Sequence, residues 1–274
     1  MTDLFSVRDK VVLVTGGTRG LGKMIARGFV EHGARVYVTS RKTADCAATE
    51  SELGALGDCR ALPSDLARPE EIARLVDELT RREPELDVLV NNAGTTWGAP
   101  LATYPLDAWD RVFAVNVRAV FQLTRDLLPQ LQARATALEP SRVINVGSIA
   151  GERVTRATHS YAYGASKAAV HHLTRILSMD LAACHITVNS IAPGVFASRM
   201  TGHRVGKETM LEVAARGTPQ GRAGAREDIV GTCLWLSARA GAHVTGAVIP
   251  LDGGLHTKPT EWRGDAPEMD LERS

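Results

Sequence analysis

Short apolar runs alternate along this chain with longer stretches in which apolar residues recur at helical spacing. The short runs are rich in valine, leucine and isoleucine, which is typical of strands buried on both faces. They predict seven strands, at residues 11–15, 35–39, 59–63, 88–91, 142–146, 186–191 and 247–251. The stretches between them predict helices near residues 20–32, 43–55, 69–82, 107–135, 161–183 and 226–238.

This alternation indicates an α/β protein, because helices that connect successive strands place the strands parallel in one sheet. We expect a single-domain, doubly wound (Rossmann) parallel sheet of seven strands with helices on both faces. No linker or repeat interrupts the pattern, so the domain is expected to span residues 1–255. Residues 194–225 break the rhythm and are long enough for a substrate lid. The polar residues 256–274 are expected to form a tail.

Composition narrows the classes of function. The chain has 274 residues, 44% of them hydrophobic and 23% charged, and a formal net charge of +1. Nucleic-acid binding therefore lacks a basic footprint. Residues 1–10 are charged and lack the apolar stretch of a signal peptide, and no segment approaches the ~18 apolar residues of a membrane helix. A cytoplasmic location without membrane contact is expected.

Cysteine and histidine positions give no metal-ligand pattern. The adjacent His171 and His172 point to different parts of a helix surface, which disfavours a shared metal. The cysteines are too widely separated for a CxxC site or a compact disulfide framework, and we expect free thiols at Cys46, Cys59, Cys184 and Cys233. No metal site is predicted.

A glycine-rich turn follows the first predicted strand and leads into the first predicted helix. The amino end of a helix presents unpaired N–H groups and a positive dipole, which favour an anion such as a pyrophosphate. The next strand ends about twenty residues later, as in the dinucleotide fingerprint. A tight turn without a ligand is the alternative. The residues expected to contact the nucleotide are Gly16, Thr18, Arg19, Gly20, Leu21 and Gly22.

Basic residues stand at the end of the second predicted strand, where NAD-binding proteins usually place a carboxylate against the adenosine ribose. This chain has Ser40, Arg41 and Lys42 there. Arg41, helped by Arg19, can pair with a 2′-phosphate, which a carboxylate would repel. The expected cofactor is NADP(H) rather than NAD(H). Two solvated arginines are the alternative.

Three ordered motifs carry a family resemblance: TGxxxGxG at residues 15–22, NNAG at residues 91–94 and YxxxK at residues 163–167. Together they resemble the short-chain dehydrogenase/reductase family over roughly residues 8–254. The resemblance implies a ketone reductase or alcohol dehydrogenase, usually a homotetramer, with its cofactor across the carboxyl ends of the strands. It further implies cofactor contacts by Asp65, Leu66, Asn92, Ala93, Gly94, Tyr163, Lys167, Pro193, Gly194, Val195 and Ser198.

Four polar residues form the expected catalytic set. Tyr163 and Lys167 stand four apart on a predicted helix, so the ammonium can favour the phenolate and make Tyr163 the proton donor to a ketone. Ser148 ends the fifth predicted strand and can hydrogen-bond the substrate oxygen, although a plain turn serine fits equally simple rules. Asn116 resembles the family's helix asparagine, which is thought to hold a water linked to Lys167. A buried asparagine satisfied by the backbone is the alternative.

Residues 94–109 resemble the rhamnolipid-type branch of NADPH-dependent β-ketoacyl reductases. A 3-oxoacyl thioester on acyl carrier protein or CoA, or a related β-keto ester, is therefore the expected substrate. An apparent small insertion within residues 152–159 alters the predicted pocket rim. The expected pocket residues, each also compatible with core packing, are Trp97, Val154, Tyr161, Phe196 and Met200.

Basic residues near the expected entrance can meet an acidic carrier protein: Arg153, Arg156, Arg199, His203 and Arg204. The alternative is that these basic side chains are simply solvated charges on loops and bind no partner. A broad ketone reductase and a polyol or sugar-acid dehydrogenase are rivals within the enzyme class. A non-catalytic NADP-sensing binding protein is the rival outside it.

Overall fold

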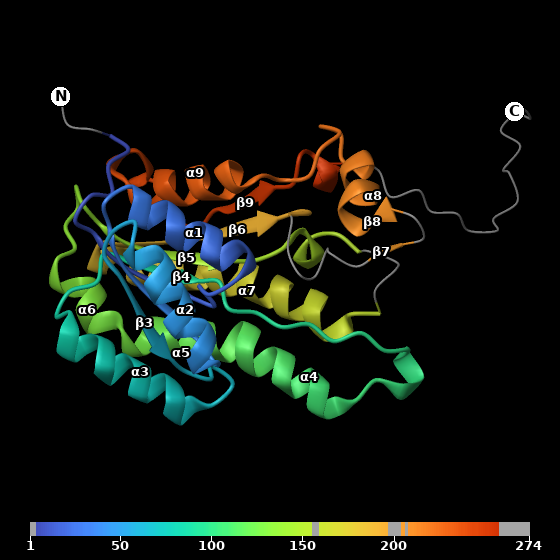
Figure 1. The fold of residues 1–274 in the computed structure, drawn as a ribbon, viewed down its shortest axis with the longest axis horizontal. Helices are drawn as coiled ribbons and strands as arrows, with labels where there is room; N and C mark the ends of the chain where they lie inside the picture. The colour runs from blue at the N-terminus through green and yellow to red at the C-terminus, as the bar shows by residue number, and fades with distance from the viewer. Residues whose placement is uncertain (1–3, 155–158, 197–203, 206–207, 258–274) are drawn as a thin grey trace, which may run out of the picture.

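Seven parallel strands lie side by side in one sheet, in the order β3-β2-β1-β4-β5-β6-β9 (Figure 1). The computed structural model describes residues 4–154, 159–196, 204–205 and 208–257. The strands are β1 (Val11–Thr15), β2 (Arg35–Ser40), β3 (Cys59–Pro63), β4 (Val88–Asn91), β5 (Ser141–Val146), β6 (Ile186–Pro193) and β9 (Val248–Leu251). Every strand expected from the sequence is present, and its ends lie within two residues of the expected ones.

The strand order reverses at β1. The chain runs outward from β1 through β2 to β3 and then returns to place β4 on the other side of β1. In a doubly wound sheet the connections after two such strands leave in opposite directions, which opens a crevice at their carboxyl ends. This crevice is where a ligand is expected to bind.

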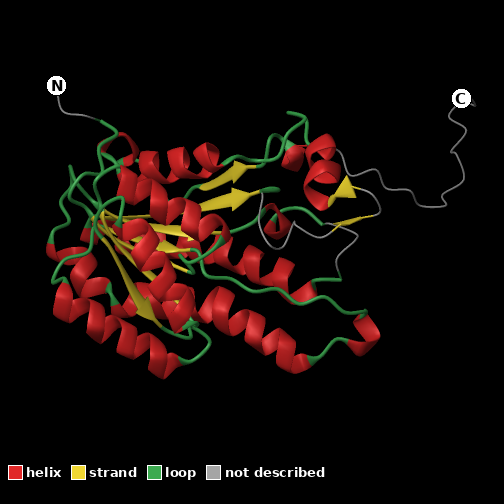
Figure 2. Ribbon diagram, viewed as in Figure 1, coloured by secondary structure: helices red, strands yellow, loops and turns green. Residues whose placement is uncertain are grey.

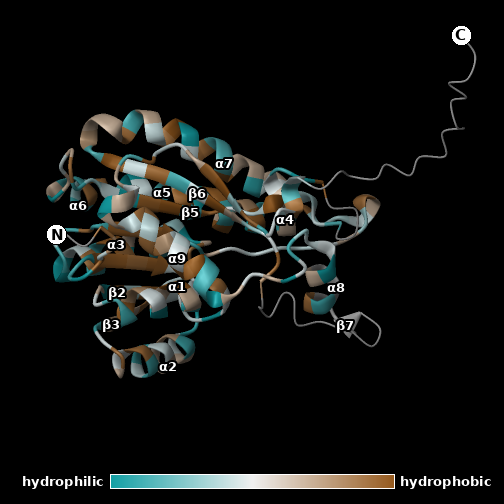
Figure 3. Ribbon diagram, turned by 90° about the horizontal axis from the view of Figure 1, so that it is seen from above, coloured by the Kyte–Doolittle hydropathy of each residue, from teal (hydrophilic) through white to brown (hydrophobic). Residues whose placement is uncertain are grey.

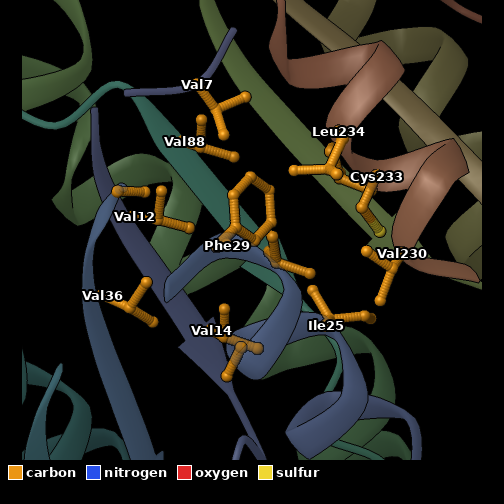
Figure 4. Packing of buried hydrophobic residues seen from close by; sticks show 14 of the residues in the cluster. Val7, Val12, Val14, Ile25, Phe29, Val36, Val88, Val230, Cys233 and Leu234 are labelled. Atoms are coloured by element: carbon orange, nitrogen blue, oxygen red, sulfur yellow. The ribbon is translucent and has the colours of Figure 1, made fainter. Parts of the chain in front are cut away.

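Alternate residues of β1 belong to hydrophobic clusters on opposite faces of the sheet. Val12 and Val14 pack with Phe29 of α1 (Gly20–Glu31), and Figure 4 shows this cluster from close by. Leu13 belongs to a second cluster with Leu75 of α3 (Pro69–Arg82). Because side chains alternate across a strand, a fully apolar run is what a sheet covered on both faces requires.

Helices cover the sheet on both sides (Figure 2). The first cluster receives buried residues from α1, α2 (Thr43–Gly54) and α9 (Arg226–Ser237). The second receives them from α3, α5 (Ala119–Asp126), α6 (Leu128–Ala133) and α7 (Tyr161–Leu181). The hydropathy colouring of Figure 3 places hydrophobic residues along the strands between these helices.

The long helix expected at residues 107–135 is interrupted. The chain forms α4 (Leu106–Phe113), a π-helical turn at Ala114–Arg118, then α5 and α6. Pro129, in the first turn of α6, has no N–H to donate, so it suits a new start better than a continuing helix. The π-helical turn widens the helix around Asn116 and has no counterpart in the hydrophobic pattern.

The expected lid region, residues 194–225, carries short elements. They are β7 (Arg204–Val205), β8 (Glu208–Thr209) and α8 (Met210–Gly217), and they lie between β6 and α9 in the chain. Further along, a 3₁₀ turn at Leu255–Thr257 includes the first residues of the expected tail. Within the described ranges, no helix is both long and apolar enough to cross a membrane.

Candidate active site

The polar motifs meet at one edge of the sheet because all its strands are parallel. The glycine turn follows β1, Arg41 follows β2, Gly94 follows β4 and Ser148 follows β5. Carboxyl ends of parallel strands share an edge, and this edge of a doubly wound sheet is where such proteins bind their ligands.

The glycine turn is locked to the segment that follows β4. Gly16 and Gly20 have φ values of 64° and 53°, in the left-handed region that favours glycine. A Cβ at Gly22 would lie 2.3 Å from the Asn92 Nδ2 atom. That amide donates to the Thr15 carbonyl oxygen at 2.8 Å. Asn92 therefore holds the turn in shape, and no side chain fits at position 22.

The start of α1 is free to bind an anion. Its N-cap residue, Arg19, makes no side-chain capping bond, and the first turn carries no acidic residue. The first N–H groups of a helix have no intrahelical partner, and the dipole there is positive. This arrangement fits the pyrophosphate of a dinucleotide.

Three basic side chains near that turn make no described contact with a carboxylate. Arg19, Arg41 and Lys42 are exposed, and among the described residues none of them forms an ion pair or a side-chain hydrogen bond. Unpaired guanidinium groups are suited to a phosphate, which they bind by two parallel hydrogen bonds. The residues present therefore fit a nucleotide that carries a 2′-phosphate.

Other expected cofactor contacts line the same edge. The Asp65 Oδ1 atom accepts from the Ala67 N–H at 3.1 Å, and the Leu66 side chain is buried. Pro193 ends β6, and Gly194 donates to the Leu251 carbonyl at 3.0 Å. Beyond it, the Val195 carbonyl accepts from the Gly224 N–H. Ser198 and Met200 lie outside the described residues.

Ser148, Tyr163 and Lys167 are brought together where β5 meets α7. The Lys167 Nζ atom lies 5.7 Å from the centre of the Tyr163 ring. It donates to the Val146 carbonyl oxygen at 2.6 Å, which anchors the ammonium on the end of β5. A hydrogen bond with Ser148 reaches the Tyr163 hydroxyl. The phenol thus lies between a hydroxyl and an ammonium.

Burial sets the titration of these groups. It raises the pKa of the Tyr163 phenol above its ordinary value, and the hydrogen bond with Ser148 only partly opposes it. This direction is opposite to the one expected from the sequence, because Lys167 bonds to Val146 while the low-dielectric surroundings disfavour phenolate. Burial also lowers the pKa of Lys167 to about 8. Tyr163 therefore keeps its proton at neutral pH, as a proton donor requires.

The Ser148 hydroxyl already accepts one hydrogen bond within the protein. Its Oγ atom accepts from the Ala150 N–H at 3.1 Å, as the N-cap of a short 3₁₀ turn at Ile149–Gly151. A hydroxyl has one proton to donate and two lone pairs, so accepting from Ala150 leaves Ser148 able to donate, as it does in its hydrogen bond with the Tyr163 hydroxyl. This geometry suits a donor to a substrate carbonyl.

Asn116 has its amide satisfied by its neighbours. Its Oδ1 atom accepts from the Thr95 N–H at 2.9 Å, and its Nδ2 atom donates to the Thr95 carbonyl at 3.0 Å and to Ser166 Oγ at 2.9 Å. Of the two interpretations of this residue, the geometry favours a buried asparagine that joins the π-helical turn to α7. A Cβ at Gly94 would lie 3.5 Å from Asn116 Oδ1 and 3.7 Å from Lys167 Nζ, so the chain passes close to both.

The expected pocket residues separate into two groups. Trp97, Val154 and Tyr161 are exposed, and the Tyr161 ring lies edge-on to Tyr104 with centroids 5.5 Å apart. Phe196 is only 3% exposed and belongs to the core cluster on the α1 side, which fits the core packing that the sequence left open as an alternative for this residue.

Phe196 packs so tightly over Gly224 that a Cβ there would lie 2.3 Å from its ring. Its accessible edge borders a cavity of about 250 Å³ that also touches Asp252 and His256. None of Ser148, Tyr163 and Lys167 lines that cavity.

Arg153 does not extend freely toward a partner. Its side chain is partly buried, and its guanidinium donates to the Leu255 carbonyl oxygen. Arg156, Arg199 and His203 lie outside the described residues. The expected basic entrance therefore gains no support from Arg153.

Two residues at the site were missed by sequence reasoning. The buried imidazole of His171 contacts the backbone of Ser148, and Glu152 lies beside that imidazole. The available signal was the position of His171, four residues after Lys167 and so on the same helix face. A glycine at 147, directly before the serine, was the second sign that something large packs there.

The fold and the site together define a dinucleotide-dependent oxidoreductase. A model of the family described as enoyl-(acyl carrier protein) reductase matches residues 16–256. The chain belongs to the short-chain dehydrogenase/reductase family.

Relatives in this family include enzymes that act on different carbonyl compounds. The chain is 46% identical over 256 residues to the rhamnolipids biosynthesis 3-oxoacyl-(acyl-carrier-protein) reductase of Pseudomonas aeruginosa, which covers 93% of this chain and 100% of the relative. It is 33% identical over 256 residues to the 5-keto-D-gluconate 5-reductase of Escherichia coli K12, covering 93% of this chain and 98% of the relative.

Solved structures have the same fold over nearly the whole chain. The Pseudomonas aeruginosa RhlG/NADP active-site complex aligns with a TM-score of 0.89 at 46% identity, covering 93% of this chain and 100% of that one. A gluconate 5-dehydrogenase from Burkholderia cenocepacia in complex with NADP and tartrate aligns with a TM-score of 0.84 at 28% identity, covering 94% and 99%.

Proposed function

We propose that this protein reduces the ketone of a 3-oxoacyl thioester with NADPH and that Tyr163 donates the proton. The observation that carries the proposal is the meeting of Tyr163, Ser148 and Lys167 at the sheet edge that also holds the uncapped start of α1. The thioester is supported by the 46% identical relative, whose name describes a 3-oxoacyl reductase.

The residues divide the work of the reaction. NADPH bound at this edge supplies the hydride to the carbonyl carbon. Ser148 Oγ donates a hydrogen bond to the ketone oxygen, and the Tyr163 hydroxyl gives that oxygen its proton. The Lys167 ammonium then offsets the negative charge left on the phenol, because it lies over the ring. The product is a secondary alcohol.

The substrate test follows the loss of NADPH absorbance with acetoacetyl-CoA, ethyl acetoacetate, 5-keto-D-gluconate and crotonyl-CoA offered separately. We expect turnover of both acetoacetyl compounds and none of crotonyl-CoA, because Ser148 and Tyr163 are arranged to polarise and protonate an oxygen. A Tyr163→Phe variant should bind NADPH and lose at least about a hundredfold in kcat. Full activity of that variant would exclude the assigned proton donor.

A sugar-acid reductase is the second candidate, favoured by the relative that acts on 5-keto-D-gluconate. Turnover of 5-keto-D-gluconate without turnover of either acetoacetyl compound would select it. NADPH binding without turnover of any ketone would instead support a non-catalytic nucleotide sensor.

The choice of cofactor is tested at the end of β2. An Arg41→Ala variant should raise the KM for NADPH by roughly ten- to a hundredfold, the scale of lost charge-assisted hydrogen bonds, and leave the KM for NADH unchanged. Arg60→Ala on β3 is the matched control, since Arg60 is exposed but faces Asp58 at 3.9 Å. Equal effects of Arg41→Ala on both nucleotides would contradict 2′-phosphate recognition.

Three further features belong to this proposal. Residues 194–225 act as the substrate lid, four copies of the chain assemble, and the enzyme works in the cytoplasm. Acyl carrier protein is a proposed partner on the strength of the relative's name. Its recognition is not assigned to Arg153, whose guanidinium is bonded to Leu255.

A further inference from the structure

The imidazole of His171 fills the space under the loop that carries Ser148. His171 projects from α7, one turn after Lys167, and is 3% exposed. A Cβ at Gly147 would lie 2.1 Å from its Nε2 atom, and one at Gly151 would lie 3.0 Å from its Cε1 atom. The loop from Gly147 to Gly151 therefore packs on this ring: Gly147 makes room for the imidazole, and Gly151 makes room first for the Lys167 backbone, 2.7 Å from such a Cβ, and then for the ring.

The ring makes a directed contact as well as a packing contact. Its Nε2 atom accepts from the Ser148 backbone N–H at 3.4 Å, a long hydrogen bond. An accepting Nε2 means that the proton of a neutral ring sits on Nδ1. The Nδ1 atom faces the Glu152 carboxylate, with 3.8 Å to Oε1. Glu152 thus favours the tautomer that Ser148 needs.

The surroundings keep this imidazole neutral. Burial is the largest cause that lowers the pKa of His171 to about 4, and the charges of Lys167 and Arg175 on the same helix contribute to this shift. A protonated ring would have no lone pair for Ser148. Near neutral pH, His171 is therefore an acceptor.

We propose that His171, oriented by Glu152, is a positioning residue that fixes the backbone of Ser148 and so aims the Ser148 hydroxyl at Tyr163 and the substrate oxygen. His171 touches neither the cofactor site nor the Tyr163 hydroxyl in any described contact, so it acts through Ser148. The role depends on the reductase activity proposed above. It adds a residue that the catalytic set expected from the sequence does not contain.

The test compares variants that separate volume from hydrogen bonding. His171→Leu fills the space without an acceptor, His171→Gln places an amide near the Nε2 position, and His171→Asn is polar but too short to reach Ser148. We expect kcat to fall about tenfold in the leucine and asparagine variants, the scale of one hydrogen bond that matters in the transition state. The glutamine variant should retain most of the wild-type kcat. The KM for NADPH should stay within twofold of the wild-type value in all three variants.

A Ser148→Ala background decides whether the effect runs through the serine. There, His171→Leu should change kcat by less than twofold, because the hydroxyl that it aims is gone. His172→Leu is the matched control: His172 is the exposed neighbour on α7, and it should behave as wild type. An undiminished loss in the Ser148→Ala background, or equal activity of the glutamine and asparagine variants, would overturn the proposal.

A measurement without turnover separates this role from the proposed function. Nitrogen NMR of isotope-labelled histidine reads the tautomer directly, and we expect His171 to carry its proton on Nδ1 and to change toward a mixture in Glu152→Gln. A proton on Nε2 in the wild type would reject the positioning role even in an active reductase. Absence of ketone turnover with the expected tautomer would reject the reductase function and would leave standing only the contact between His171 and the Ser148 backbone.

Discussion

At the scale of single residues, the site depends on two groups that burial shifts in useful directions. Tyr163 holds its proton more tightly than a free phenol, and Lys167 gives its proton up more easily than a free lysine. Both effects come from desolvation, which penalises the charged form of each group. A phenol that must donate a proton is thereby kept protonated, while the ammonium stays charged below about pH 8.

A pH dependence follows from the pKa of Lys167. Because that pKa is about 8, ketone reduction should be nearly constant from pH 6 to pH 7.5 and fall about tenfold per unit at higher pH, as Lys167 becomes neutral. The measurement is kcat/KM with saturating NADPH. In Lys167→Arg the decline near pH 8 should disappear, since a guanidinium does not titrate there. A flat wild-type profile to pH 9.5 would contradict the link.

Sequence patterns predict some residues of the site and miss others. The glycine turn, Ser148, Tyr163 and Lys167 were predicted because each has a fixed place relative to a strand or a helix turn. The raised pKa of Tyr163 was not, because burial depends on residues far apart in the chain. His171 was missed for the same reason: its partner, Ser148, is 23 residues away and is met only in the fold.

At the scale of elements, the strands were predicted better than the helices. A buried strand is recognised in the sequence as a short apolar run, and each of the seven predicted runs forms a strand of the sheet. Helical spacing is less decisive, because it does not show where the backbone bonds change from the α-helical to the π-helical spacing. The break at Ala114–Arg118 rests instead on bonds made by Asn116 across to Thr95 and Ser166.

Asn116 should therefore matter for stability as well as for activity. Replacing Asn116 by Ala removes its three bonds and leaves the partly buried Thr95 backbone groups without these partners, at a cost of about 1–3 kcal/mol of unfolding free energy. Urea unfolding monitored by circular dichroism measures the change. Gln132→Ala, an exposed position on α6, is the control and should stay within about 0.5 kcal/mol. An unchanged midpoint in Asn116→Ala would reject the structural role.

At the scale of the whole molecule, the sheet is a partition between two hydrophobic clusters. The cluster on the α1 side joins helices from the start and the end of the described chain, since α1 and α9 both pack on it. Phe29 lies within this cluster and is 1% exposed. A defect there should loosen both ends of the domain at once.

Phe29→Ala should accordingly lower the unfolding free energy by about 3–5 kcal/mol, because it removes a buried ring and leaves a cavity. Leu56→Ala is the control: Leu56 is 46% exposed, and its loss should cost less than about 0.5 kcal/mol. Thermal unfolding without nucleotide makes the comparison, since a bound ligand would add its own stabilisation. Equal stability of the two variants would show that the cluster is not the support described here.

The π-helical turn also fixes the phase between the two halves of the helical segment from Leu106 to Asp126. An α-helix rotates about 100° per residue, so deleting one residue within Ala114–Arg118 would let a regular helix form and would swing α4 around relative to α5. The chain could gain regular backbone hydrogen bonds by this loss and yet no longer present an asparagine to Thr95. In this stretch a regular α-helix is therefore incompatible with the bond between Asn116 and Thr95. The extra residue of the π-helical turn is what places Asn116 for that bond.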